Sequence, residues 1–283
     1  MSPGDERGEP SPILPSVIVP NLDNAAFLQL TLDSIAAQSV PELDVVIVDG
    51  GSTDGSVELI RRWASEHDAR WISEPDRGQA EAINKGFRMV RGDIVTWVNS
   101  DDLLHPSSAA LAVREFSRDP ELEFLWGFCV EIDARGTPLR VQNPIVRREL
   151  GELRRTRNFV PQPACWFRRS LLDRFGLLDE SLHFAFDYEL FLRFAGETRA
   201  RFLPEILAQF RVHPGSKTVS QTGAFFPEAW AAFRRHGGRL RSPFVLDSVR
   251  NQWLAPLWKV ASSPLRAALR RAFGLRPGER VRP

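Results

Sequence analysis

The sequence contains few of the residues on which several common protein classes depend. Its 283 residues include only two cysteines, Cys129 and Cys165, and one tyrosine. Two cysteines cannot form a disulfide framework, and the spacing of Cys and His does not match a zinc site, so a reducing compartment is favoured. A formal net charge of +1 and the lack of a long apolar run argue against a nucleic-acid-binding protein and against a transmembrane protein.

Two glycine-rich phosphate-binding motifs are also missing. Neither GxxxxGK[ST] nor GxGxxG occurs, which argues against an ordinary ATPase and against a dinucleotide-binding dehydrogenase. Residues 1–15 are polar and rich in proline and glycine, without the apolar stretch of a signal peptide, and we expect a flexible leader there.

The overall composition, 43% hydrophobic and 26% charged residues, is typical of a globular protein. The charge is unevenly distributed, because Phe233–Pro283 carry twelve basic and two acidic residues, a local charge of +10. Apolar and basic side chains interleave there, as in helices that lie on an anionic membrane surface. We expect residues 221–283 to form a basic amphipathic helical extension that contacts a membrane surface, packs on the acidic body or forms a homodimer contact.

Short apolar runs alternate with helical patterns along the chain, which predicts βαβ units and a mainly parallel sheet flanked by helices. The predicted strands are Ser16–Pro20, Leu43–Val48, Arg70–Ser73, Ile94–Val98, Phe124–Ile132, Arg201–Leu203 and Gln209–Val212. The predicted helices are Ala25–Ala37, Ser56–Ser65, Gln79–Val90, Leu111–Phe116, Ser170–Phe175 and Asp187–Phe194.

Polar residues lie at the ends of three predicted strands or in the adjoining loops, at Asn21–Asn24, Asp49–Asp54 and Asn99–Asp102. In a parallel sheet these strand ends meet at one edge, which is where ligands bind. The sequence therefore predicts a ligand site at this edge.

Each polar segment has a chemical and a structural interpretation. Asp49 is able to accept hydrogen bonds from a base or a ribose, or it only shapes a tight turn in which Asp54 caps the next helix. The adjacent carboxylates Asp101 and Asp102 suit a hard divalent cation, or they cap a helix or shape a turn.

Asp187 and His213 have the same two kinds of interpretation. Asp187 opens a helix beside Phe184 and Phe186, and partial burial would raise its pKa and make it a better base near neutral pH; as an N-cap it would be purely structural. His213 would ligate the metal while Lys217 meets a diphosphate, or it is a hydrogen-bonded structural residue.

Together these segments resemble glycosyltransferase family 2, the inverting nucleotide-sugar transferases with a GT-A fold. The resemblance runs from Ser16 to Lys217 and is carried by Ser16–Asn24, Val45–Gly55, Glu74–Gln79, Ala82–Gly86, Gly92–Asp102, Phe186–Arg193 and Arg211–His213.

The resemblance implies a GT-A domain over residues 16–220, with a nucleotide-sugar half at about 16–103 and an acceptor half at about 104–220. It places Asp187 at the catalytic base and Gln162 among acceptor-side residues. The residues implied to bind the nucleotide sugar are Pro20, Asn21, Asp23, Asp49, Asp76, Arg77, Asn99 and Asp101. The implied metal ligands are Asp102, which is preferred, with Asp101 and His213.

Three residues depart from the family pattern. Leu22 stands where an aromatic residue is frequent, Gly50 replaces a second acid, and Asn99 replaces the first acid of the DxD metal motif. These departures put in doubt stacking on the base, contact with the base and the strength of metal binding.

The resemblance implies transfer of a sugar, with Mg²⁺ or Mn²⁺, from a UDP, GDP or dTDP sugar to a glycan or a lipid-linked glycan in cell-surface polysaccharide or glycolipid assembly. The expected location is cytoplasmic or peripheral on the inner face of the plasma membrane, without nucleic-acid partners. Two alternatives are a non-catalytic nucleotide-sugar-binding relative, which Asn99 motivates, and a sugar-1-phosphate nucleotidyltransferase, whose glycine-rich signature Pro20–Asn24 lacks.

Overall fold

The first half of the sheet is parallel, as the alternation of strands and helices predicts. The computed structural model describes residues 12–142, 149–156, 158–217 and 225–238. The parallel strands are β1 (Pro15–Asn21), β2 (Asp44–Asp49), β3 (Arg70–Ser73) and β4 (Ile94–Trp97). The connecting helices are α1 (Ala25–Ala36), α2 (Ser56–His67) and α3 (Gln79–Met89).

The second half extends the sheet with strands of both directions. These are β5 (Leu103–Leu104), β6 (Phe124–Ile132), β7 (Pro138–Gln142), β8 (Cys165–Arg168) and β9 (Ala200–Arg211). The helices are α4 (Ser108–Arg118), the 3₁₀ turns η1 (Leu150–Arg154) and η2 (Gln162–Ala164), α5 (Ser170–Phe175), α6 (Phe186–Phe194) and α8 (Phe225–Arg235). Among the described residues nine strands form one sheet in the order β3-β2-β1-β4-β8-β6-β9-β5, with β7 paired to β6.

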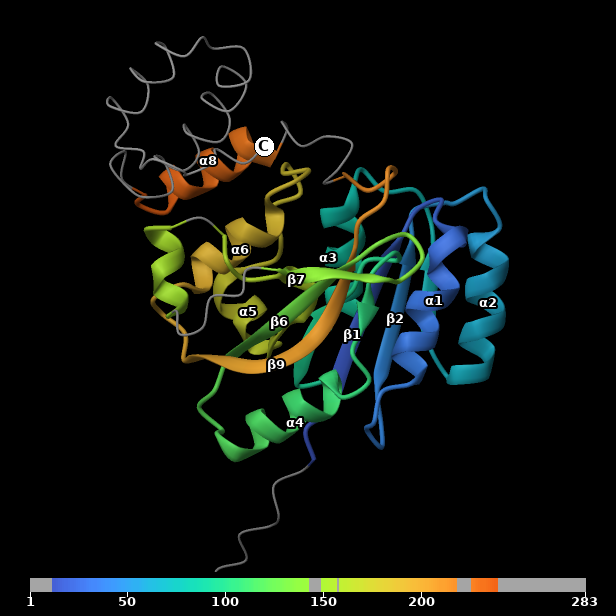
Figure 1. The fold of residues 1–283 in the computed structure, drawn as a ribbon, viewed down its shortest axis with the longest axis horizontal. Helices are drawn as coiled ribbons and strands as arrows, with labels where there is room; N and C mark the ends of the chain where they lie inside the picture. The colour runs from blue at the N-terminus through green and yellow to red at the C-terminus, as the bar shows by residue number, and fades with distance from the viewer. Residues whose placement is uncertain (1–11, 143–148, 157, 218–224, 239–283) are drawn as a thin grey trace, which may run out of the picture.

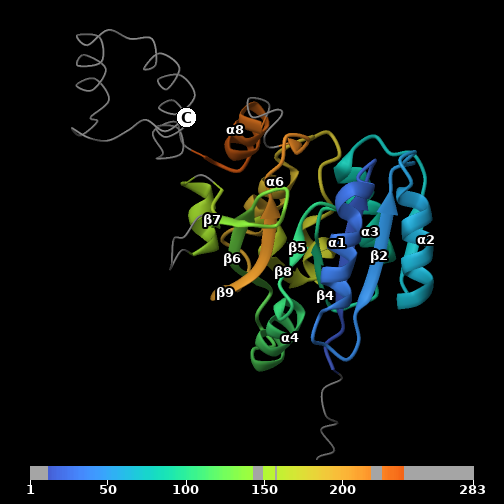
Figure 2. The same cartoon turned by 45° about the vertical axis from the view of Figure 1, so that its right-hand side comes forward.

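Helices cover both faces of this mixed, mainly parallel sheet (Figures 1 and 2). Alternate side chains of each strand face opposite sides, so one strand supplies two cores. Val17 and Val19 pack with α1, α2 and α4, whereas Ile18 between them packs with α3, α5 and α6. The two buried layers fix the register of the strands and hence the position of the loops at their ends.

Two local predictions are wrong. Arg201–Leu203 and Gln209–Val212 are not separate strands but belong mainly to the single strand β9, whose pairing with β6 shifts register around Phe128. Gly127 permits this close approach, because a Cβ atom there would lie 2.6 Å from the carbonyl oxygen of Glu205. Asp54 is not the N-cap of α2; that position is Gly55, at a φ of +96°.

The termini of the chain lie largely outside the described residues. These undescribed parts include residues 1–11 of the expected leader and residues 239–283 of the expected basic extension. The described part of that extension, α8, packs against α6 (Figure 1). None of the helices in the described ranges has both the length and the apolar character needed to cross a membrane.

Candidate active site

A cavity of about 780 Å³ opens between the loops that follow the parallel strands and the second half of the molecule. Most of the residues that the sequence singles out line it, although they come from distant parts of the chain. They are Pro20, Asn21, Asp23, Asp76, Asn99, Asp101, Gln162, Asp187 and His213. Three predicted residues, Asp49, Arg77 and Asp102, are not among the residues that line it.

Asp49 holds the first two loops of the site together. Its buried carboxylate accepts hydrogen bonds from Asn21 Nδ2 at 2.8 Å, Ser52 Oγ at 2.5 Å and Ser73 Oγ at 2.7 Å. The backbone N–H groups of Gly51 and Ser52 donate to it as well, at 3.1 and 2.9 Å. Burial opposes ionisation, but these hydrogen bonds prevail and lower the pKa of Asp49. Five donors therefore occupy the carboxylate that the sequence predicts to contact the nucleotide.

Asp76 fills the space above Gly50. A Cβ atom on Gly50 would lie 2.6 Å from Asp76 Oδ2 and 3.3 Å from Leu22 Cδ1, so any larger residue would push Asp76 away. Asp76 Oδ1 accepts the N–H of Gly78 at 2.9 Å, and burial raises the pKa of this carboxyl. Gly50 lacks the second acid of the family pattern, but the Asp76 carboxylate, from the loop after β3, lies beside it. Leu22, the other departure from the pattern in this loop region, is 57% exposed.

Asp23 and Arg77 differ in their relation to the cavity. Asp23 lines it, and its Oδ1 accepts the N–H of Thr53 at 2.8 Å. The side chain of Arg77 is 77% exposed and forms ion pairs with Glu81 at 2.7 Å and Glu180 at 2.5 Å. Neither partner lines the cavity, so the Arg77 side chain is held by ion pairs at the surface beside α3 in this conformation.

Asp101 and His213 meet at the cavity wall. Asp101 Oδ2 lies 3.0 Å from His213 Nε2, although 112 residues separate them. A carboxylate oxygen and an imidazole nitrogen facing one cavity fit a divalent transition metal such as Mn²⁺, with bound phosphates or waters as further ligands. Within the described residues no three His, Cys, Asp or Glu side chains cluster as a self-sufficient metal site.

Asp102 lies behind this pair, fully buried. Its Oδ1 accepts the backbone N–H of Arg211 at 2.9 Å, and its Oδ2 accepts Asn99 Nδ2 at 3.1 Å. Burial, followed by the negative charge of Asp101, raises the pKa of Asp102 well above its ordinary value. The arrangement ties the Asn99–Asp102 turn to the end of β9, which positions Asp101 opposite His213.

The amide groups of Asn99 and Gln79 connect the Asn99–Asp102 turn to the start of α3. Gln79 Nε2 donates to Asn99 Oδ1 at 2.6 Å, and Lys217 Nζ donates to Gln79 Oε1 at 3.2 Å. The positively charged side chain of Lys217 therefore lies near this turn, at the cavity. Gln79 could not be found from the sequence, since a glutamine at a helix start has no distinctive spacing.

Asp187 also lines the cavity, from the first turn of α6. Its Oδ1 accepts the backbone N–H of Tyr188 at 2.7 Å, and among the described residues no side chain donates to it. Burial raises the pKa of Asp187 to about 6, despite the hydrogen bonds from the helix backbone. A carboxylate with this pKa is ionised at neutral pH and is a stronger base than an exposed one.

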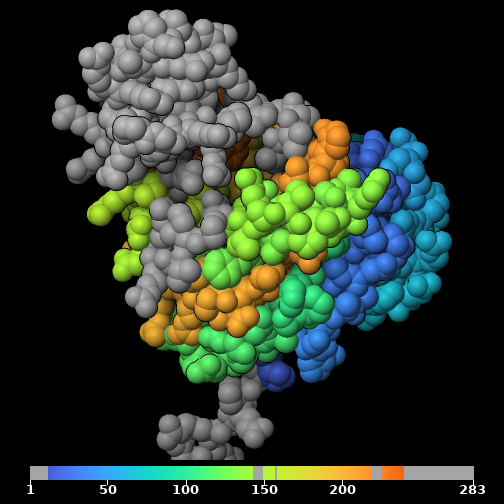
Figure 3. All heavy atoms as spheres, viewed as in Figure 1, coloured from blue at the N-terminus to red at the C-terminus, as the bar shows by residue number. Residues whose placement is uncertain are grey.

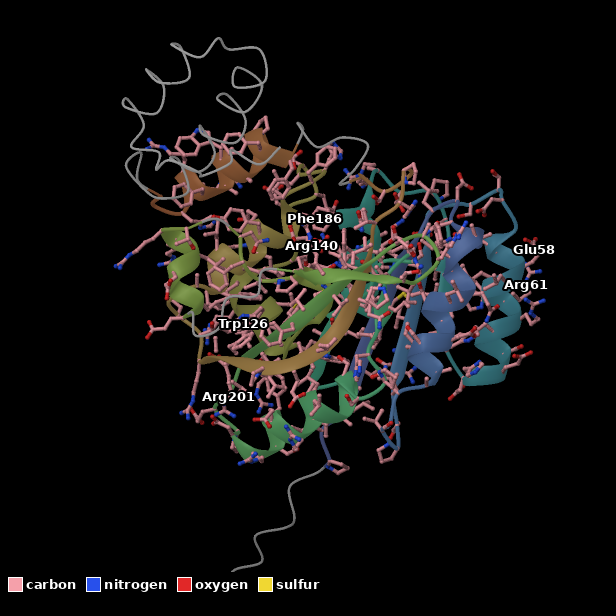
Figure 4. All side chains as sticks on the ribbon, viewed as in Figure 1. Glu58, Arg61, Trp126, Arg140, Phe186 and Arg201 are labelled. Atoms are coloured by element: carbon pink, nitrogen blue, oxygen red, sulfur yellow. The ribbon has the colours of Figure 1, made fainter. Side chains whose placement is uncertain are left out.

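Apolar side chains also line the cavity and form its apolar wall. Phe184 and Phe186, close to Asp187 in the chain, contribute to this wall, together with Val160 and with Phe225 of α8 (Figure 4 labels Phe186). Gln162 lines the cavity as well, and its Nε2 donates to the carbonyl of Trp97 at 2.7 Å. Phe225 could not be found from the sequence, because it carries no motif.

The outer surface beside the cavity is formed by β7, which lies next to β9 in Figure 3. Its last residue, Gln142, reaches the cavity wall. Leu139 and Val141 of this strand are exposed, so β7 presents apolar side chains to the outside.

A comparison with protein families decides the assignment. The model of "Glycosyl transferase family 2" matches residues 16–176, more than half of the chain. The chain belongs to glycosyltransferase family 2. The match begins with the first strand and includes every predicted site residue up to Gln162, whereas Asp187 and His213 lie beyond it.

The chain is also similar, at low sequence identity, to curated proteins that are mostly longer than it is. The chain is 26% identical to the hyaluronan synthase of Pasteurella multocida, over 74% of this chain and 22% of the relative. It is 30% identical to the PGL/p-HBAD biosynthesis glycosyltransferase of Mycobacterium bovis, over 57% of this chain and 61% of the relative. The chain thus spans well under half of the synthase's length.

Two solved structures have the same fold. TarS 1–349 of S. aureus, in complex with UDP-GlcNAc, matches with a TM-score of 0.65 and 20% identity, over 82% of this chain and 68% of that one. The mannosyltransferase PcManGT of Pyrobaculum calidifontis, in complex with GDP-Man and Mn²⁺, matches with a TM-score of 0.59 and 22% identity, over 92% and 79%. The GT-A-like fold that the resemblance implies is confirmed.

Proposed function

We propose that this glycosyltransferase moves a sugar from a nucleoside diphosphate sugar to an acceptor hydroxyl, with inversion at the anomeric carbon. The observation that carries the proposal is the position of Asp187. A carboxylate with a pKa raised to about 6 lines the same cavity as the Asp101–His213 pair. One base and one leaving-group site facing a shared cavity are what a single displacement requires.

The donor would bind at the ends of the parallel strands. Asp23, Asp76 and Asn99 line this side, and two proteins of the same fold bind UDP-GlcNAc and GDP-Man. We assign contact with the nucleoside to Asp76 and not to Asp49. The Asp49 carboxylate already accepts hydrogen bonds from five donors, whereas the N–H of Gly78 donates to Oδ1 of Asp76 and leaves Oδ2 for a ligand. Asn21 and Pro20 complete this wall, and Asp49 supports it from behind.

Each catalytic residue would have a defined task. The Asp187 carboxylate would take the proton from the acceptor hydroxyl as the oxygen attacks the anomeric carbon. Phe184 and Phe186 would exclude water from this carboxylate and so maintain its basicity. Lys217, held by Gln79, would attract the diphosphate, and Gln162 would line the acceptor side.

A divalent cation fits the residues on the donor side. Asp101 and His213 would hold Mg²⁺ or Mn²⁺, and Asp102 would orient the turn through Arg211 and Asn99. When bound, the cation supplies positive charge that stabilises the departing diphosphate. PcManGT, whose structure contains Mn²⁺, supports this assignment by its shared fold.

The acceptor would be a glycan or a lipid-linked glycan in cell-surface polysaccharide or glycolipid assembly. Hyaluronan synthase and the PGL/p-HBAD glycosyltransferase among the relatives support this class. We propose the division into a GT-A domain at residues 16–220 and a basic extension at 221–283 that brings the enzyme to the inner face of the membrane.

Thermal unfolding with UDP, GDP, dTDP and CDP, each with and without Mn²⁺, tests the donor site. A nucleotide at a hundred times its dissociation constant stabilises the fold by about 2.7 kcal/mol, which is a shift of several degrees. A shift with one nucleotide that increases with Mn²⁺ is the expected result. The nucleotide that gives it names the donor base for a subsequent assay of sugar transfer.

The second candidate is a non-catalytic nucleotide-sugar-binding protein, which Asn99 favours because it removes one negative charge from the metal motif. Transfer of radiolabelled sugar to glycan acceptors separates the two functions. Nucleotide binding without transfer to any acceptor, or hydrolysis of the donor, would favour the binding protein over the enzyme.

A further inference from the structure

The carboxylate of Glu228 joins α8 to the segment that precedes the Asp187 helix. Its Oε2 accepts the backbone N–H of Phe184 at 2.7 Å and that of Ala185 at 3.0 Å. The N–H of His183 donates to both carboxylate oxygens, each at 3.0 Å. Three consecutive amides are thus held by one side chain from 43 to 45 residues further along the chain.

These three amides lie directly before the first turn of α6. Ala185 is the N-cap of that helix, and no side chain within the segment caps its N-terminus. The N–H groups at the start of a helix have no partner within the helix. The Glu228 carboxylate accepts the N–H of the N-cap residue Ala185 and the two N–H groups before it, so it fixes the backbone that leads into the first turn. Asp187 is the second residue of this helix, and its position depends on that start.

Other contacts hold α8 to the protein without touching this segment. Arg235 Nη1 forms an ion pair with Asp179 Oδ2 at 3.0 Å, and His236 Nε2 lies 2.8 Å from Glu189 Oε1. Phe233 is fully buried in the core that α6 shares. The residues that hold α8 to the protein are therefore different from Glu228, which holds residues 183–185.

We propose that Glu228 is a positioning residue that sets the location of Asp187 in the active site. The inference rests on the proposed function, because it takes Asp187 as the base. Ordering the 183–185 segment places Phe184 and Phe186 against the cavity and fixes the first turn of α6. α8 also contributes Phe225 to the cavity, so this first helix of the proposed extension forms part of the cavity wall.

The test compares Glu228→Ala, Glu228→Gln and Arg235→Ala in the full chain. Arg235→Ala is the matched control, since it removes a half-exposed ion pair of the same helix and leaves residues 183–185 untouched. Displacing a reacting group by about 1 Å can cost roughly 100-fold in rate, so Glu228→Ala is expected to lower kcat by about 10- to 100-fold. Glu228→Gln keeps an acceptor oxygen and should retain more activity.

Two readouts separate positioning from a general loss of structure. Nucleotide affinity should not fall in any of the three variants. The negative charge of Glu228 acts on Lys217, so removing that charge leaves Lys217 at least as available to a diphosphate. Hydrogen exchange at the amides of residues 183–185 should accelerate in Glu228→Ala, less in Glu228→Gln and not in Arg235→Ala. If Glu228→Ala does not fold, Glu228→Gln alone decides, through its kcat and its exchange.

Wild-type kcat in both Glu228 variants would overturn the inference, as would a parallel loss of nucleotide affinity. Equal losses of kcat in Arg235→Ala and Glu228→Ala would overturn it too, since docking alone would then explain them. A failure of the proposed function would look different, because the wild type itself would then transfer no sugar. In that case Glu228 would have no catalytic base to position.

Discussion

At the scale of single residues, Asp187 makes opposite contributions to activity and stability. Its pKa rises from 3.8 to about 6 on folding, so ionising it in the folded protein costs up to about 3 kcal/mol. This cost is absent below pH 3.8, where the residue is protonated in both states, and it is complete above pH 6. Asp187→Asn should therefore raise the melting temperature at pH 7 and leave it nearly unchanged at pH 3.5.

The same variant should lose transfer by a factor of about 100 to 10,000 while nucleotide binding is retained. In the wild type, the rate should fall as the pH drops below about 6, because the base becomes protonated. Melting curves at the two pH values and a pH–rate profile check both expectations. Full activity in Asp187→Asn would show that the proton is taken by another group.

Gly50 and Asp76 should behave as one functional unit. Gly50→Ala would place a Cβ atom 2.6 Å from Asp76 Oδ2 and displace this carboxylate, so it should weaken nucleotide binding much as Asp76→Asn does. In a double-mutant cycle measured by titration calorimetry, the two losses should not add, since each removes the same carboxylate from the site. Additive losses would mean that Gly50 acts independently of Asp76.

At the scale of elements, the loop after β2 depends on Asp49. Asp49→Asn replaces an acceptor with an amide whose N–H₂ would face the donors of Asn21 and the serines, and it should cost about 1–3 kcal/mol of unfolding free energy. The pKa of Asp49 is lowered on folding, so its ionised form stabilises the wild type above pH 3.8 and that stabilisation is lost as the pH falls through the folded pKa.

Denaturant melts at pH 7 and pH 3 check this expectation: the deficit of Asp49→Asn should be larger at pH 7. The matched variant is Asp187→Asn, which makes the same chemical change at a carboxylate with a raised pKa and should stabilise the protein at pH 7. Destabilisation of equal size by both variants would contradict the assignment of opposite pKa shifts.

The elements also show how far the sequence predicts the site. Apolar periodicity identifies β1, β2 and β4, and the polar segments that begin at Asn21, Asp49 and Asn99 mark their ends, so the edge that carries the proposed donor residues is predictable. Whether a carboxylate points into the cavity is not, because it depends on distant partners. Asp102 is turned to the backbone of Arg211, 109 residues away, and the contacts of Glu228 span more than 40 residues.

At the scale of the whole molecule, the two halves contribute different residues to the cavity. Asp76 and Asp101 line it from the loops after the parallel strands, whereas Asp187 and the apolar wall come from the second half. Under the proposed function, the donor-side residues and the base thus belong to different halves. Asp101 and His213, which are 112 residues apart in the chain, connect the two halves at the cavity.

The basic segment Phe233–Pro283 should bring the protein to an anionic membrane. Its charge of +10 would contribute on the order of 1 kcal/mol per basic residue near the surface, and the attraction should weaken as salt shortens the Debye length. The full chain is expected to co-sediment with vesicles that contain phosphatidylglycerol, and not with neutral phosphatidylcholine vesicles. Binding should fall between 0.05 and about 0.5 M NaCl.

A chain that ends after Gly238 is the control, because it retains α8 with Glu228 and removes ten of the twelve basic residues of that segment. It should lose vesicle binding and keep nucleotide binding. If the full chain ignores anionic vesicles, sedimentation equilibrium of both chains decides between the remaining roles. A dimer that the truncation dissociates would assign the segment to an interface between copies, whereas a monomer in both cases would assign it to packing on the acidic body.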